Sequence, residues 1–260
     1  MIVERCKWKN LDAMKCLTAR HELIVLVAAG PRIVSLRASG YGNLLYEDTS
    51  DFRVGDWRIY GGHRLTTAPE SDTSYEPDND PCTVEILADR IIVRAARRAS
   101  GIVLTMVITE APDGFNLDHS IQNEGHSTLE AALWAITCIP RTAQVSASCD
   151  TFKLSYWPGT DPANWRQENG TLTFAKGAYT GKVGWHALKP NFLVLQEQGS
   201  LNISSNDTSR PEACTDHGSN MELYTNSQFI ELETLSQQFA VYPGETVGHH
   251  QKWTVQPPSI

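Results

Sequence analysis

Two carboxylates near the C-terminal end of the chain lie two residues apart in a segment with the composition of a β-strand. Residues 229–235 read Phe-Ile-Glu-Leu-Glu-Thr-Leu. Because side chains alternate between the two faces of a strand, Glu231 and Glu233 should share one face. Like charges held close together raise the pKa of one carboxyl group, which suits proton transfer. Glu222 lies on the preceding predicted strand, residues 221–225, and adds a third carboxylate nearby. An ordinary solvated sheet face is the alternative interpretation.

A second polar group follows a glycine pair in residues 60–70, which read Tyr-Gly-Gly-His-Arg-Leu-Thr-Thr-Ala-Pro-Glu. Two glycines let a backbone turn sharply or approach a ligand. His63 and Arg64 then offer a titratable imidazole and a rigid fork of donors, and we predict that they converge with the carboxylates on one cleft. Simple turn formation is the alternative. Tyr75, Asp78 and Asn79 follow later in the chain. Their hydroxyl, carboxylate and amide groups are of the types that recognise sugar hydroxyls.

The elements that must position these residues are short strands separated by turn residues. Several segments alternate apolar and polar residues, which is typical of strands with one solvated face. No amphipathic helix of three turns is found, and residues 41–81 and 157–170 are predicted to be long functional loops. We predict one domain over residues 1–260, a large antiparallel β-sandwich whose curved sheet forms a cleft. The predicted strands are 22–27, 32–36, 83–87, 90–94, 102–109, 115–122, 129–138, 192–196, 221–225, 229–235 and 246–255.

The composition limits the classes of partner. The chain has 260 residues, of which 41% are hydrophobic and 20% charged, and this suffices for a large core. Its net charge of -8 disfavours nucleic acids and anionic membranes as partners. The N-terminus has no apolar run, and the six cysteines are scattered. The sequence therefore predicts a cytoplasmic protein with reduced thiols.

No spacing of histidines or cysteines predicts a metal site. His249 and His250 are adjacent, and adjacent strand residues face opposite ways, so the pair cannot easily share one ion. The sequence also lacks the glycine patterns that bind nucleotides and the serine nucleophile turn of hydrolases. We therefore predict cofactor-free chemistry on a small molecule.

Together these segments resemble the galactose mutarotase-like superfamily, which includes the aldose 1-epimerases. Residues 26–36 are similar to its opening strand pair, and residues 61–64 are similar to the Gly-Gly segment of hexose-phosphate epimerases. Residues 221–226 resemble a strand of the family, and residues 242–246 resemble its Pro-Gly-Glu turn. The similarity is strongest to an uncharacterised branch with GGHR and ELETL patches. It implies a β-sandwich that binds a carbohydrate.

The resemblance also implies roles for individual residues. Glu233 lies in a Leu-Glu-Thr that matches the segment carrying the catalytic base of mutarotases, so Glu233 is the predicted base. The mutarotases' general acid is a histidine on a mid-chain strand, but residues 130–137 contain no histidine. Trp134 occupies its place and would stack on a sugar ring. His63 is the predicted acid, with His217 as second choice.

The predicted function is that of an aldose 1-epimerase-like enzyme that interconverts anomers of a sugar or sugar derivative. In the implied reaction a carboxylate removes the O1 proton, an acid protonates the ring oxygen, and the ring recloses on its other face. Arg64 would hold a substrate oxygen or an anionic substituent, with Glu231 and Glu222 beside it. The alternatives are a non-catalytic carbohydrate-binding module, and a sugar isomerase or lyase that uses the same cleft.

Overall fold

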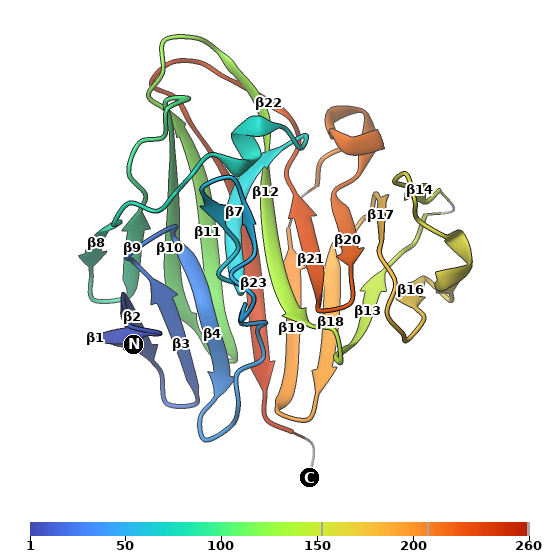
Figure 1. Ribbon diagram of the computed structural model, residues 1–260, viewed down its shortest axis with the longest axis horizontal. Helices are drawn as coiled ribbons and strands as arrows, with labels where there is room; N and C mark the ends of the chain where they lie inside the picture. The colour runs from blue at the N-terminus through green and yellow to red at the C-terminus, as the bar shows by residue number, and fades with distance from the viewer. Residues whose placement is uncertain (152, 207, 259–260) are drawn as a thin grey trace.

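The chain folds into two large antiparallel β-sheets that pack face to face (Figure 1). The computed structural model describes residues 1–151, 153–206 and 208–258. The helical segments in these residues are short 3₁₀ turns. None of the described helices is long and apolar enough to cross a membrane. The predicted antiparallel β-sandwich is confirmed.

Within each sheet of the described chain, strands that are distant in sequence lie side by side. In spatial order, the eleven-stranded sheet contains β1 (Ile2–Trp8), β2 (Leu11–Leu17), β3 (His21–Leu26), β4 (Arg32–Ala38), β7 (His63–Ala68), β12 (Leu129–Pro140), β21 (Phe229–Leu235), β20 (Met221–Thr225), β17 (Gly181–Trp185) and β14 (Ser155–Tyr156), with β22 (Phe239–Val241) paired to β12. The ten-stranded sheet contains, in the same way, β15 (Trp165–Glu168), β16 (Thr171–Phe174), β13 (Gln144–Ser148), β18 (Asn191–Gln196), β19 (Gly199–Ser205), β23 (Thr246–Gln256), β11 (Gly114–Asn123), β10 (Ile102–Ala111), β9 (Arg90–Arg94) and β8 (Thr83–Ile86). The smaller elements are the pair β5 (Arg53–Val54) and β6 (Trp57–Arg58), and the turns η1 (Asp72–Tyr75), η2 (Pro162–Asn164), η3 (Pro211–Ala213) and η4 (Asp216–Gly218).

The segments predicted as strands are strands in the structure, but the prediction that residues 41–81 form a loop is wrong. β7 lies inside this stretch and pairs with β12 on one side and β4 on the other. All its residues are buried. Its sequence, His-Arg-Leu-Thr-Thr-Ala, hides the strand because polar side chains are buried on both of its faces. The predicted loop 157–170 likewise contains η2 and β15.

The glycine pair before β7 lets this strand lie against β4. Gly61 and Gly62 have φ angles of +91° and +67°, which favour glycine. A Cβ atom on Gly62 would lie 1.9 Å from the carbonyl oxygen of Ile33 on β4. Any side chain at Gly62 would therefore push β7 away from its neighbour.

The apolar core fills the space between the two sheets. Leu23 and Ile33 of the eleven-stranded sheet belong to the same buried cluster as Phe115, Ile203 and Trp253 of the ten-stranded sheet. These side chains are at most 1% exposed. Burial of one such side chain contributes roughly 1.5–3 kcal/mol, so this shared core stabilises the packing of one sheet on the other.

Buried histidines join the two sheets through this core. His63 on β7 faces His119 on β11, with 2.7 Å between their Nε2 atoms. The Nδ1 of His119 lies 3.2 Å from the carbonyl oxygen of His249, which can only accept, so this Nδ1 carries a proton. The Nε2 of a neutral His119 must then accept from His63. The Nδ1 of His63 accepts in turn from the hydroxyl of Thr137 at 2.9 Å.

A second polar contact between the sheets lies beside the first. Thr234 on β21 lies 2.7 Å from Nε2 of His249 and accepts a 2.7 Å hydrogen bond from Gln251, both of which are on β23. The side-chain carbonyl of Gln251 accepts from the indole of Trp253 at 2.9 Å. Because these groups are buried and satisfy one another, an added proton on a histidine would have no compensating partner.

We expect the free energy of unfolding to fall as the pH falls from about 6.5 to about 4. Burial and neighbouring charges lower the pKa of His63 well below its usual range, and burial lowers that of His119 to about 4. Below about pH 6.5 the unfolded chain therefore binds protons that the folded chain refuses, so stability present above this pH is lost on acidification. For His119 alone the loss is on the order of 3 kcal/mol. Urea unfolding across this pH range measures it.

The matched variants separate this effect from general acid denaturation. His119→Met should be less stable near neutral pH but should lose less stability on acidification, because it cannot titrate. His126→Gln changes an exposed histidine and should keep the wild-type pH profile. If His119→Met kept the wild-type pH dependence of stability, His119 would not be a source of the acid sensitivity.

Candidate active site

A cleft opens on the face of the eleven-stranded sheet that points away from the core. Arg64 and Glu233 both pair with Ile136 of β12, and Glu222 pairs with Glu233, so their side chains share this face. Glu231 lies two residues before Glu233 and shares it too, as strand alternation requires. The cleft has a volume of about 540 Å³, and its lining includes Arg64, Tyr75, Trp134, Lys182, Glu231 and Glu233.

The floor of the cleft holds a lysine between two glutamates. Nζ of Lys182 on β17 lies 2.6 Å from Oε2 of Glu222 and 3.0 Å from Oε2 of Glu233. The same oxygen of Glu233 accepts a 2.7 Å hydrogen bond from the indole of Trp134. Both carboxyl groups are 0% exposed, whereas the Lys182 side chain is 12% exposed. Lys182 is therefore the member of this trio that solvent reaches.

One of the two carboxyl groups keeps its proton, because two anions beside one cation would leave an uncompensated buried charge. Burial raises the pKa of Glu222 well above its usual range, and Glu233 adds to this effect while Lys182 opposes it. Although Glu222 lies close to Lys182, neither of its oxygens has hydrogen-bond geometry with a described group. Glu233, in contrast, accepts hydrogen bonds from Trp134 and Lys182. Burial therefore favours the protonated form of Glu222.

Lys182 keeps its charge despite its burial. Burial works against the ammonium, but Glu233 and Glu222 outweigh burial and raise the pKa of Lys182. Its Nζ also lies 4.4 Å from the centroid of the Trp134 ring, a cation–π contact. The ammonium of Lys182 thus depends on the carboxyl groups that it contacts.

A second ion pair lies beside the trio. Arg64 donates to Glu231 at 3.1 Å, and its guanidinium lies 5.1 Å from the ring centroid of Trp57. Burial raises the pKa of Glu231, with Arg64 opposing and Glu233 adding to the rise. Since Glu231 already neutralises Arg64, this pair suits a neutral hydroxyl better than an anionic substituent. In the described ranges no group of three histidine, cysteine or acidic side chains is placed to hold a metal ion.

Aromatic rings form the walls of the cleft. Trp57, Trp134, Trp157 and Tyr75 all line it. Trp57 and Tyr75 pack edge to face with their centroids 5.3 Å apart, and Lys182 lies 5.1 Å from the centroid of Trp157. Flat apolar rings beside hydrogen-bonding groups suit the apolar faces and the hydroxyls of a sugar ring.

The prediction that His63 joins the cleft is wrong. His63 directly precedes Arg64 on β7, and adjacent strand residues point to opposite faces. His63 therefore lies between the sheets, 0% exposed, against His119 and Trp253. It is on the opposite side of the sheet from Glu233, and its placement gives no support to a role as general acid.

Four other predicted site residues lie outside the cleft lining, and one of them, Glu222, contacts the cleft only through Lys182. Asp78 forms a buried ion pair of 2.9 Å with Arg32, which holds the segment after η1 to β4. Asn79 is exposed, and its amide donates a hydrogen bond of 2.7 Å to the backbone carbonyl of Asp56. His217 packs edge-on against Trp157 with centroids 5.4 Å apart, so it supports a cleft wall from outside. Tyr75 does line the cleft.

Lys182 is the functional residue that sequence reasoning missed. It lies on β17, whose Gly-Lys-Val-Gly-Trp sequence has two glycines and no regular alternation. The available signal was indirect, because a buried cluster of glutamates requires a cation and the sequence does not show which one. Trp157 was also left out of the predicted site, since it lies in a stretch rich in turn residues.

The comparisons with known proteins identify the fold. No protein-family model and no curated protein sequence matches the chain. Among solved structures, a TPR-domain containing protein from Parabacteroides distasonis matches with a TM-score of 0.70 and 14% identity, over 96% of this chain. This chain spans about half of that protein, 48% of its length.

Two further structures match over nearly their full length. An Escherichia coli protein provisionally described as an aldose 1-epimerase has a TM-score of 0.64 and 10% identity, covering 94% of this chain and 98% of its own. A galactose mutarotase-like protein from Clostridium acetobutylicum has a TM-score of 0.60 and 11% identity, covering 99% of both chains. The chain has the galactose mutarotase-like fold, as the resemblance of its sequence predicted.

We expect Lys182→Met to lower the free energy of unfolding by roughly 3–5 kcal/mol at about pH 8, because it leaves buried carboxyl groups without their cation. Without Lys182 the pKa of Glu222 rises further, so the folded state gains stability from protonation as the pH falls. The defect should therefore shrink at about pH 5. Urea unfolding at the two pH values measures it.

Two further variants provide the controls. Lys189→Met removes an exposed lysine and should have little effect at either pH. Adding Glu233→Gln to Lys182→Met should recover part of the lost stability, since it removes the uncompensated charge. If Lys182→Met and Lys189→Met were equally stable at about pH 8, the charge of Lys182 would not stabilise the buried glutamates.

Proposed function

We propose that the chain is an aldose 1-epimerase-like enzyme that interconverts the anomers of a sugar or a neutral sugar derivative. The observation that carries this proposal is the trio of Lys182, Glu222 and Glu233, of which Lys182 and Glu233 line an aromatic cleft. It supplies a carboxylate and an ammonium 3.0 Å apart, which is the pair of groups that anomer exchange requires. The fold similarity to the E. coli and C. acetobutylicum proteins supports the same reaction class.

In the proposed mechanism Glu233 is the base and Lys182 replaces the histidine acid that the sequence lacks. Glu233 takes the proton of the O1 hydroxyl and becomes neutral. Because Glu222 is already protonated, Lys182 then has no neighbouring anion in the trio, and burial makes its ammonium a stronger acid. Lys182 gives its proton to the ring oxygen as the C1–O5 bond breaks. Rotation about C1–C2 and the reverse transfers close the ring and return both protons.

The remaining cleft residues orient the sugar in this proposal. Arg64 and Glu231 carry donors and acceptors for neutral hydroxyls, and their side chains are 9% and 12% exposed. Trp134 and Trp157 offer faces for the ring. The substrate must reach Glu233 past Lys182, whose flexible stem can move aside, since active-site contacts often tighten only in the complex.

The complete burial of Glu233 favours a second candidate function. A carboxylate with 0% exposure, fixed by Trp134 and Lys182, is also what a rigid binding surface would contain. On this reading the chain is a carbohydrate-binding protein without turnover. The two functions differ in whether bound sugar exchanges its anomers.

We expect Glu233→Gln to lower the rate of anomer exchange by roughly two to four orders of magnitude, the usual contribution of a positioned base. Its stability should change little, because Glu222 can then supply the anion for Lys182. NMR exchange spectroscopy on a panel of neutral aldoses measures the rate, and a melting curve measures the stability.

Glu130→Gln is the matched control, because Glu130 is exposed on β12 and lies outside the cleft. It should keep the wild-type rate. Full activity of Glu233→Gln would remove Glu233 as the base. Sugar binding by the wild-type chain with no acceleration of exchange would establish the second candidate instead.

A further inference from the structure

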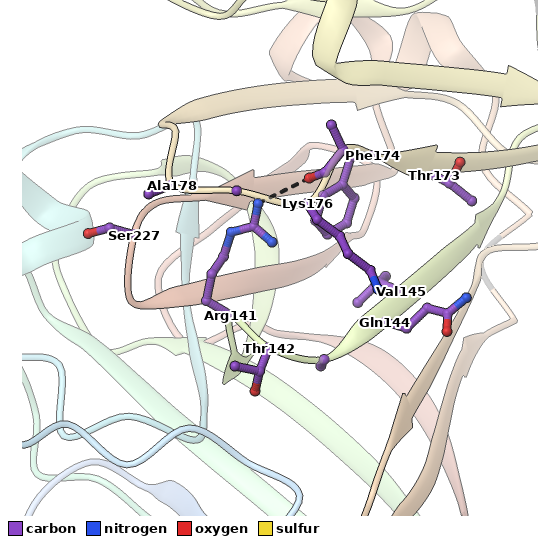
Figure 2. Close-up of a pocket in the computed structure, with 12 residues that line it drawn as sticks. Arg141, Thr142, Gln144, Val145, Thr173, Phe174, Lys176, Ala178 and Ser227 are labelled. Atoms are coloured by element: carbon purple, nitrogen blue, oxygen red, sulfur yellow. Dashed lines mark hydrogen bonds between the residues drawn. The ribbon is translucent and has the colours of Figure 1, made fainter.

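A second pocket lies next to the sugar cleft, on the other side of the turn between β20 and β21. Asn226 lines the cleft and Ser227 lines this pocket. The pocket has a volume of about 660 Å³ and is formed by the turn between β12 and β13, the end of β16 and the segment that follows it. Figure 2 shows Ser227 and Gln144 at opposite ends of it, with Arg141 and Lys176 between them.

Arg141 packs against two aromatic rings at this pocket, and no described carboxylate forms an ion pair with it. Its guanidinium lies 5.3 Å from the ring centroid of Phe174 and 5.2 Å from that of Tyr179. Nη2 donates to the backbone carbonyl of Ala175 at 3.2 Å (Figure 2). Nε is buried and has no hydrogen-bond partner among the described residues. The aromatic rings thus pack against a guanidinium whose charge no described carboxylate neutralises.

The charged residues that line the pocket are all positive. Lys176 is the second cation there, and no aspartate or glutamate belongs to the described lining. Neither Arg141 nor Lys176 forms an ion pair with a described carboxylate, although ten other arginines in those ranges do. In a chain with a net charge of -8, two unpaired cations in one pocket form a local site for an anion.

Part of the uncharged lining consists of residues whose side chains can bind oxyanions. Thr142, Thr173, Ser227 and Gln144 are among the lining residues, beside the apolar Val145 and Phe174. A phosphate monoester accepts hydrogen bonds on three oxygens and carries up to two charges, so it can use a guanidinium, an ammonium and hydroxyls together. A pocket of about 660 Å³ is also larger than a phosphate group and leaves room for an organic substituent.

We propose that this pocket binds a phosphorylated small molecule, with its phosphate on Arg141 and Lys176. The site is separate from the sugar cleft, whose cations are each paired with carboxylates. The two sites share the turn that contains Asn226 and Ser227, so occupation of one can alter the wall of the other.

Titration of the whole chain with methyl phosphate at about pH 8, followed by calorimetry or ³¹P NMR, tests the proposal. We expect saturable binding to one site and a loss of affinity of roughly tenfold or more in Arg141→Gln, because a charge-assisted contact is removed. Lys176→Gln should also weaken binding. Acetate should bind more weakly than methyl phosphate, since it has fewer acceptor oxygens and a single charge.

Matched variants make the result specific. Arg166→Gln removes an exposed arginine of β15 that is paired with Glu168, and it should bind methyl phosphate like the wild type. Glu233→Gln should also bind normally, which would place the phosphate outside the sugar cleft. Melting curves show whether each variant is folded. No saturable binding, equal affinity in Arg141→Gln and Arg166→Gln, or acetate binding as tight as methyl phosphate would each overturn the proposal.

Discussion

The cleft depends on the neutralisation of buried charge. Glu222, Glu231 and Glu233 lie on one face of two neighbouring strands, where they are almost completely excluded from water. Such a cluster is stable only if each charge has a partner or is removed by a proton. Arg64 pairs with Glu231, Lys182 pairs with Glu233, and the raised pKa of Glu222 favours its neutral form. The same requirement links the protonation of Glu222 to the charge of Lys182.

The strands that form the cleft also join the two sheets. On β7, Arg64 points into the cleft, whereas His63 crosses the core to His119. On β21, Glu233 faces Lys182, whereas Thr234 contacts His249 and Gln251. Because side chains alternate with a period of two, a shift of one residue would exchange the two sets. The polar contacts in the core therefore fix the register that positions the cleft residues.

This alternation also explains how much of the structure the sequence could predict. The strand 229–235 alternates clearly, so the shared face of Glu231 and Glu233 followed from period two alone. The stretch 63–68 is polar and follows two glycines, which favoured a loop. In a loop His63 and Arg64 could both face a ligand, but in a strand they cannot.

Lys182 could not be predicted because its role arises from contacts between residues distant in sequence. It meets Glu222 and Glu233 through the pairing of β17, β20 and β21. Asp78, in contrast, was predicted to be a site residue and is not one. Its type suits a sugar hydroxyl, but burial beside Arg32 makes it a structural ion pair. Residue type thus indicated the chemistry of the cleft, while strand pairing decided which side chains take part.

The most direct test of this account is the protonation state of Glu222 in the resting protein. Infrared spectroscopy detects the C=O stretch of a protonated carboxyl group, and ¹³C labelling of glutamate shifts this band. Near pH 7 ordinary glutamates are ionised, so a buried protonated glutamate should stand out. The account predicts a labelled C=O band near pH 7 that disappears in Glu222→Gln and persists in Glu130→Gln. Absence of this band in the wild-type protein, or its persistence in Glu222→Gln, would contradict the proposed proton on Glu222.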